Sequence, residues 1–132
     1  METLQQSIEG MHKNPFMLYN HIEIGAVERD HAETRLVLQP DSLNTFGRVH
    51  GGAFFTMADV CAGMTARSDG RRYVTQDASV NFIRNVTGGT LTCRGTVLNR
   101  GRKVCLVETR VTDDTGRLLF SGVFTMYCVS ED

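Results

Sequence analysis

Asp59 is an isolated acid in an apolar stretch of the sequence. Between Gly51 and Met64 only Thr56 and Asp59 have polar side chains, and no cation stands three or four positions from Asp59 to pair with it on a helix. Burying an unpaired carboxylate is costly unless its pKa rises or another element supplies a partner. Asp59 is therefore either paired with or capping a distant element, or a catalytic carboxylate.

The preceding segment, NTFGRVHGG at residues 44–52, could supply a donor for the same chemistry. It ends in Gly51 and Gly52, directly ahead of the apolar stretch. The first N–H groups of a helix have no partner within the helix, and glycine lets a ligand approach closely. Such a terminus suits an oxyanion or a polarised carbonyl. The glycines could equally make a tight turn, with His50 as a core or capping residue.

The rest of the sequence predicts the elements that must position these residues. A short helix or cap interrupted by Pro15 is expected in the first twenty residues, and an apolar helix from about Gly52 to Arg67. Two β-rich runs predict a hairpin or bulged ribbon, and four alternating segments predict further strands: 21–30 and 31–39, then 73–83, 90–99, 103–113 and 117–129. The connections NVTGG, RGR and DTG are typical of hairpins, which makes the last four strands antiparallel neighbours in chain order.

These elements predict an α+β fold in which an antiparallel sheet wraps around one long central helix. The last strand alternates two apolar sets, one with Phe120 and Phe124 and the other with Val123 and Tyr127, so both of its faces need cover. One helix covers one face only. We therefore expect a homo-oligomer, either a dimer or a tetramer built as a dimer of dimers.

Composition narrows the function classes. A chain of 132 residues with a net charge of −1 is expected to form one domain over residues 1–132, with no overall attraction to nucleic acid or anionic membranes. It has no apolar run long enough to cross a bilayer and no signal-peptide pattern, so a cytoplasmic location is expected. The four cysteines and four histidines lack metal-ligand spacing, and neither a metal nor a disulfide is expected.

Taken together, the motif resembles that of the hotdog-fold acyl-CoA thioesterases, the 4-hydroxybenzoyl-CoA thioesterase-like superfamily, and in particular its phenylacetate-pathway branch. The pattern N-x-x-G-x-x-H-G-G followed by an aspartate inside the helix is met by six residues: Asn44, Gly47, His50, Gly51, Gly52 and Asp59. The resemblance covers roughly residues 20–129. It implies the hotdog fold and hydrolysis of an acyl-CoA thioester.

The resemblance also implies roles for individual residues. The catalytic carboxylate falls on Asp59, as general base toward water or as nucleophile, and the N–H that polarises the carbonyl falls on Gly51. Asn44 and His50 would line the thioester end of the pocket, and the hydroxyl that positions water or the carboxylate matches Thr75. In one departure, related sequences commonly have proline after the arginine at the strand end, where this chain has Asn85 after Arg84.

Helix geometry constrains how these residues can cooperate. Gly51 and Asp59 are eight residues apart, which places them about 12 Å apart along one helix. One acyl carbonyl cannot contact both in a single chain. The sequence therefore predicts sites shared between two chains, with two equivalent sites per dimer.

Coenzyme A, here part of the substrate rather than a separate cofactor, requires cations for its phosphates. The sequence RGRK at a predicted hairpin and the arginine at the end of a strand are candidates: Arg84, Arg100, Arg102 and Lys103. Arg71 and Arg72 are in a similar position. For each of these residues, a solvated turn is the competing interpretation.

Three other functions fit parts of the pattern. A hotdog hydratase or dehydratase would pair a histidine with an acid at a different spacing. A non-catalytic acyl-CoA-binding module needs no carboxylate, but sensors of this kind carry an added DNA-binding segment. A hydrolase based on Cys61 and His50 has nothing in the helix to lower the thiol pKa. The acyl group itself, aryl or fatty, is not specified by the sequence.

Overall fold

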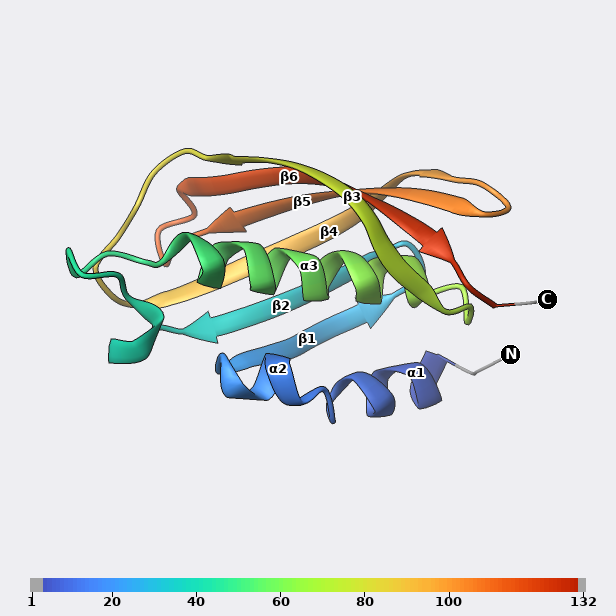
Figure 1. The fold of residues 1–132 in the computed structure, drawn as a ribbon, viewed down its shortest axis with the longest axis horizontal. Helices are drawn as coiled ribbons and strands as arrows, with labels where there is room; N and C mark the ends of the chain where they lie inside the picture. Colours follow the sequence, from blue (N-terminus) through green and yellow to red (C-terminus); the bar gives the residue numbers. More distant parts are fainter. Residues whose placement is uncertain (1–3, 131–132) are drawn as a thin grey trace.

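A computed structural model describes residues 4–130 and shows one long helix lying across a six-stranded antiparallel sheet (Figure 1). The helix, α3, spans Gly51–Arg67. The strands are β1 Ile22–Glu28, β2 His31–Val37, β3 Tyr73–Phe82, β4 Thr90–Arg100, β5 Val104–Thr112 and β6 Leu118–Cys128. Their order in the sheet is β1-β2-β4-β5-β6-β3, so β1 and β3 are the edges. The expected α+β architecture is confirmed.

The core lies between α3 and the inner face of the sheet. Alternate residues of β6, among them Phe120, Phe124 and Met126, are buried against α3, because successive side chains of a strand point to opposite faces. Gly95 lets the helix approach β4 closely, since a Cβ at this position would collide with the Thr65 hydroxyl and lie 3.1 Å from the Cys61 sulfur. The helix therefore packs closely against β4 at this position.

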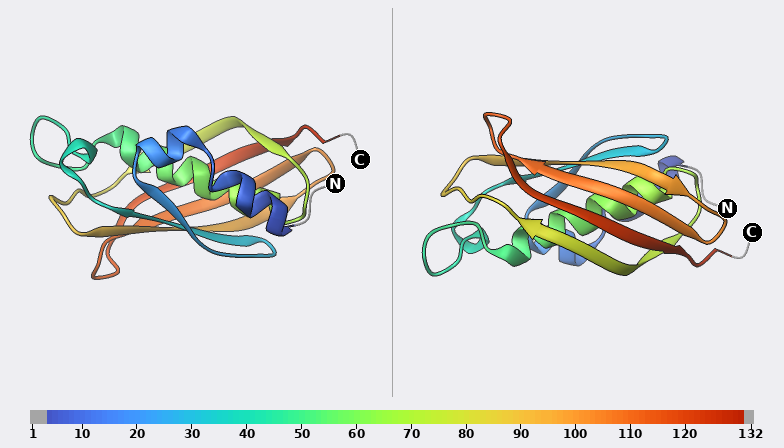
Figure 2. Two further views of the ribbon diagram at one scale, coloured as in Figure 1. Left: turned by 90° about the horizontal axis from the view of Figure 1, so that it is seen from below. Right: turned by 90° about the horizontal axis from the view of Figure 1, so that it is seen from above.

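Two apolar surfaces stay open in the single chain. Val123 and Tyr127, on the outer face of β6, are each 37% exposed. On α3, Gly52 and Phe55 are exposed and Asp59 is half-buried, so the helix is not covered all round by its own chain. The right-hand view of Figure 2, from above, shows that no helix covers the outer face of the sheet. A second copy of the chain remains the predicted cover for these surfaces.

The predicted adjacency of the third and fourth strands is wrong. β3 pairs with β6 and β4 pairs with β2, at separate places in the sheet. The NVTGG segment, expected to be a hairpin turn, instead runs across the end of the sheet (Figure 1). Its polar groups bind distant segments: the Asn85 side chain binds Val49, and the Gly89 carbonyl accepts from the Leu38 N–H at 3.0 Å. Local composition was therefore misleading here.

The N-terminal segment forms two short helices, α1 Leu4–Met11 and α2 Pro15–Tyr19, which lie beside β1 and α3 (Figure 1). Pro15 occupies the first turn of α2, where its missing N–H is not needed. β1 and β2 form the expected antiparallel hairpin. Over residues 4–130, no helix has the length and apolar character needed to cross a membrane.

Candidate active site

The Asp59 carboxylate faces the edge strand β3. Its Oδ1 accepts a hydrogen bond from the Thr75 hydroxyl at 2.5 Å. Thr75 lies on the inner face of β3 and is exposed in the single chain, since no strand of the same chain covers that edge. Among residues 4–130 no arginine, lysine or histidine forms an ion pair with Asp59. Within the described chain, Asp59 is therefore held by a hydroxyl and not neutralised by a cation.

The start of α3 presents an open backbone donor. His50 caps the helix, with its Nδ1 accepting the Gly52 N–H at 2.8 Å, so that its ring proton must reside on Nε2 when the ring is neutral. The His50 carbonyl accepts from Ala53 and Phe54. Within the described residues the Gly51 N–H has no hydrogen-bond acceptor. The cap therefore satisfies the neighbouring amide and leaves the Gly51 donor available.

The Gly51 donor borders a cleft of about 350 Å³ between the helix start and the segment after β3, lined by Asn44, Val49, Gly51, Phe54, Phe82, Ile83, Arg84 and Asn85. The Asn44 Oδ1 accepts from the Phe46 and Arg48 N–H groups at 2.9 and 3.2 Å, and so shapes the loop before the helix. Gly47 completes this loop with a φ of 75°, in the left-handed region that favours glycine.

The structure brings together some of the predicted site residues and separates others. Asn44, Gly51 and Arg84 line one cleft, while Asp59 and Thr75 form a pair further along α3. His50 lines a neighbouring cleft of about 300 Å³ together with Thr56 of α3 and His21. In one chain, the donor and the carboxylate thus occupy separate places, as their spacing along the helix requires.

Arg102 and Lys103 are exposed in the turn between β4 and β5, near the end of α3 opposite to Gly51. Arg84 is also exposed, in the segment after β3. None of the three side chains forms an ion pair within residues 4–130. All three are therefore available to an anionic ligand.

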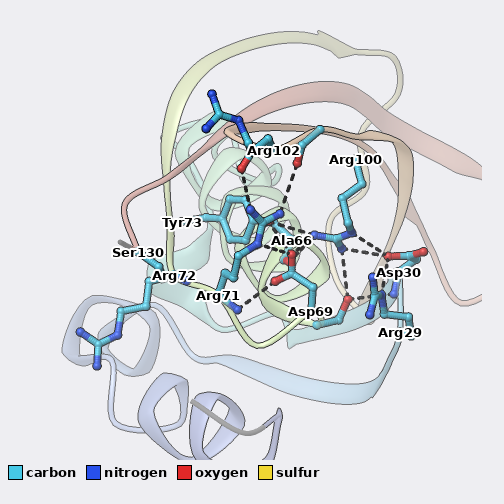
Figure 3. Close-up of polar contacts among 12 residues, drawn as sticks. Arg29, Asp30, Ala66, Asp69, Arg71, Arg72, Tyr73, Arg100, Arg102 and Ser130 are labelled. Atoms are coloured by element: carbon cyan, nitrogen blue, oxygen red, sulfur yellow. Dashed lines mark hydrogen bonds and ion pairs between the residues drawn. The ribbon is translucent and has the colours of Figure 1, made fainter. Parts of the chain in front are cut away.

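Arg100, unlike the exposed cations Arg84, Arg102 and Lys103, is largely buried. Its guanidinium binds Asp69 at 2.7 Å, Asp30 at 2.9 Å and the Ala66 carbonyl at the end of α3 at 2.9 Å (Figure 3). Its side chain is only 14% exposed. The alternation of β4 turns this side chain inward, where the guanidinium has little left to offer a phosphate. The guanidinium of Arg100 is therefore engaged within its own chain and is not available to a phosphate.

The groups around Arg100 form one connected network that is buried at Asp69 and reaches the surface at Asp30. Asp69 also binds the Arg71 guanidinium at 2.9 Å and accepts the Tyr73 hydroxyl proton at 2.6 Å. Burial and the neighbouring Asp69 carboxylate raise the pKa of Tyr73, and the hydrogen bond from Arg100 lowers the pKa of Asp30. Arg71, a further candidate for phosphate binding, is likewise engaged. This network joins the end of α3 to three neighbouring segments.

We expect Arg100→Gln to destabilise the fold by roughly 3 kcal/mol, because it leaves the Asp69 carboxylate short of a buried partner. The KM for acyl-CoA esters should not change in the folded variant. Thermal unfolding and steady-state kinetics at a temperature well below the transition measure the two effects separately. A raised KM for acyl-CoA esters without loss of stability would mean that Arg100 contacts the nucleotide part of the substrate.

Comparison with known proteins identifies the family. The model of the thioesterase superfamily matches residues 46–120, which include Gly51, Asp59 and Thr75. The chain belongs to the thioesterase superfamily. A Mycobacterium tuberculosis protein that carries the provisional name of an esterase is 30% identical over 99 residues, covering 70% of this chain and 71% of the relative.

Solved structures place this thioesterase among hotdog folds. A Streptococcus pneumoniae thioesterase, solved with coenzyme A, is 27% identical, with a TM-score of 0.86 over 93% of this chain and 97% of that one. The PaaI protein of the E. coli phenylacetic acid degradation operon is 19% identical, with a TM-score of 0.90 over 96% and 94%, a likeness of fold. The predicted superfamily and the hotdog fold are confirmed, and the enzyme is a thioester hydrolase.

Variants of the pneumococcal protein have also been solved, one with an aspartate and one with a threonine replaced by alanine. Those two positions are 16 residues apart, as are Asp59 and Thr75 in this thioesterase. Asn85 is the polar residue of the Gly51 cleft to which sequence analysis gave no role. Its only signal was a carboxamide where related sequences commonly have proline.

Proposed function

We propose that this enzyme hydrolyses the thioester of an aryl- or fatty-acyl-CoA, with Asp59 as base or nucleophile and the Gly51 N–H polarising the carbonyl. The observation that carries the proposal is the Asp59 carboxylate itself. It lies half-buried without a cationic partner in the described chain, and a hydroxyl donor fixes its direction. The matching separation of the two substituted residues in the pneumococcal thioesterase supports the pairing of Asp59 with Thr75.

Each site is proposed to form between two chains. Gly51 and Asp59 are about 12 Å apart along α3, too far for one carbonyl carbon to be reached from both. The edge of β3 is unpaired in the described chain, and the adjacent face of α3, with Gly52, Phe55 and Asp59, is open. A second copy seated along this edge would cover both surfaces and bring its own Asp59 toward the first chain's Gly51. A tetramer made of two such dimers stays a prediction.

The chemistry follows from these positions. The thioester carbonyl oxygen accepts the Gly51 N–H, whose donation strengthens as negative charge develops on that oxygen. As a base, Asp59 takes a proton from water while the water oxygen attacks the carbonyl carbon, and the proton then passes to the departing CoA sulfur. As a nucleophile, Asp59 attacks the carbonyl carbon directly, the C–S bond breaks, and water hydrolyses the resulting anhydride. Neither route requires a metal ion.

Arg84 of one chain, with Arg102 and Lys103 of the other chain that shares the site, are proposed to contact the phosphates of coenzyme A, because within one chain they lie at opposite ends of α3. We expect their combined replacement by alanine to raise KM for CoA esters at least tenfold, because each phosphate contact is charge-assisted. KM for pantetheine esters of the same acyl group, which lack the nucleotide, should change little. Parallel kinetics on both ester series measure the difference, and an equal rise in both would contradict the assignment.

The experiment that tests the function is a hydrolysis panel. Free CoA thiol is measured after addition of acetyl-, hexanoyl-, palmitoyl-, benzoyl- and phenylacetyl-CoA to the wild-type enzyme and to Asp59→Asn. The proposal requires turnover of at least one ester by the wild-type chain and its loss in the variant. Equal turnover by both proteins would place the chemistry elsewhere in the fold.

A further inference from the structure

Asn85 holds the chain just before the Gly51 donor. Its Oδ1 accepts the Val49 N–H at 3.0 Å, and its Nδ2 donates to the Val49 carbonyl at 3.1 Å. One carboxamide thus bonds both backbone groups of one residue, as a neighbouring strand would, although the Val49 N–H also reaches the Val86 carbonyl at 3.3 Å. The same Oδ1 accepts the Val86 N–H at 2.8 Å, which fixes the carboxamide against its own backbone.

The peptide group between Val49 and His50 is held at both ends. Asn85 binds its carbonyl, and its N–H donates to the Ser42 carbonyl at 2.9 Å. The next peptide group carries the Gly51 N–H, and its carbonyl is fixed by the first turn of α3. The peptide group that carries the Gly51 N–H is thus held on one side by α3 and on the other, through His50, by the peptide group that Asn85 binds.

The other end of this link is anchored in the sheet. The N–H groups of Ile83 and Arg84 both donate to the Leu119 carbonyl, at 2.8 and 3.1 Å. Asn85 follows these two residues directly and lines the same cleft as Gly51. A side chain anchored to the sheet thus sets the position of the loop that leads into α3.

We infer that Asn85 is a positioning residue for thioester hydrolysis, which fixes the Gly51 N–H toward the substrate carbonyl by clamping Val49. The inference rests on the proposed role of Gly51. A proline at position 85 would have no side-chain donor or acceptor and would lose both contacts with Val49. A displacement of about 1 Å in a catalytic group can cost about 100-fold in rate. Loss of the clamp should therefore appear in kcat.

The test compares Asn85→Ala with a matched control, Ser68→Ala. Ser68 makes the same two kinds of contact, accepting the Asp30 N–H at 2.8 Å and donating to the Thr65 carbonyl at 2.7 Å. It follows the last residue of α3, about 25 Å from Gly51. Asn85→Asp serves as a second, nearly isosteric variant, since it keeps the acceptor for Val49 N–H and places an oxygen against the Val49 carbonyl.

We expect Asn85→Ala and Asn85→Asp to lower kcat by about 10- to 100-fold, with KM changed less than about threefold. The loss should be the same for benzoyl-CoA and hexanoyl-CoA, because the Gly51 donor acts on the thioester carbonyl that both share. Ser68→Ala should lower Tm and keep kcat within about twofold of wild type, because a lost hydrogen bond remote from the site affects stability alone.

Three results would overturn the inference. They are a wild-type kcat in folded Asn85 variants, a loss confined to one of the two esters, and an equal loss of kcat in Ser68→Ala. A loss confined to one ester would make Asn85 a contact of the acyl group. If Asp59→Asn is inactive while the Asn85 variants are fully active, the positioning role fails and the proposed function stands. If Asp59→Asn keeps its turnover, the proposed function fails on that result alone.

Discussion

Asp59→Asn is expected to lower kcat for acyl-CoA hydrolysis by at least about 100-fold. An amide can neither take a proton from water nor attack a carbonyl carbon, so both proposed routes are lost. The substitution keeps the shape of the side chain, and its Oδ1 can still accept the Thr75 hydroxyl proton. Release of free CoA thiol under saturating substrate measures the effect.

The controls for this variant concern assembly and charge. Light scattering should give the same oligomer as for wild type, because the amide has nearly the same shape as the carboxylate and brings no charge to the proposed interface. Glu23→Gln removes one negative charge from an exposed position on β1 and should keep wild-type kcat. A fall in kcat of the same size in Glu23→Gln would assign the effect to net charge and not to the carboxylate at position 59.

Labelled water separates the two routes open to Asp59. In a single turnover in H₂¹⁸O, a base mechanism places the labelled water oxygen in the acid product. A nucleophile mechanism places an unlabelled Asp59 oxygen in the product if water attacks the aspartyl carbon of the anhydride. Label found by mass spectrometry in the protein and not in the acid therefore identifies Asp59 as the group that attacked the thioester carbonyl.

The parts of the fold that the sequence predicted well depend on short-range patterns. The helix expected from about Gly52 to Arg67 spans Gly51–Arg67, because its apolar run and the glycines before it are local signals. The strand limits agree to within one or two residues for the same reason, since alternation is read over a few positions. Asp59 was singled out by an equally local signal, an acid among the apolar neighbours of a helix, and its catalytic role stays a prediction.

The parts that failed depend on contacts between distant residues. Asn85 binds Val49 across 36 positions, and this contact turns the NVTGG segment away from a hairpin. Arg100 reaches Asp30 across 70 positions, and this ion pair turns its guanidinium away from the solvated turn expected for RGRK. Composition describes what a segment can do alone. It does not describe which remote polar group will compete for its side chains.

Gly51→Pro is expected to lower kcat/KM by about 100- to 1000-fold, because it removes one backbone donor to the developing oxyanion. Proline fits the first helical position, where no intrahelical hydrogen bond is lost. His50 has φ −65° and ψ 136°, a conformation that the residue before proline readily adopts. The helix should therefore form normally, and the same thiol-release assay measures the loss.

Gly51→Ala is the matched control, since it keeps the N–H and adds one methyl group. The new Cβ would lie 3.4 Å from the nearest carbon of the Phe82 ring, an ordinary van der Waals contact. This variant should lose less than about tenfold in kcat/KM, because the backbone donor that stabilises the developing oxyanion is kept. Equal losses in Gly51→Ala and Gly51→Pro would mean that space at the helix start, and not the donor, limits the reaction.

Mixing the two inactive chains extends the Gly51→Pro prediction to the shared site. In a dimer of one Asp59→Asn chain and one Gly51→Pro chain, one site combines the intact Gly51 of the first with the intact Asp59 of the second. The other site carries both defects.

Refolding the chains together at equal concentration should therefore restore about a quarter of wild-type activity, since half of the dimers are mixed and each has one working site of two. If each site lay within one chain, every site would carry one defect and the mixture would stay inactive, so recovery of turnover requires the donor and the carboxylate to come from different protomers.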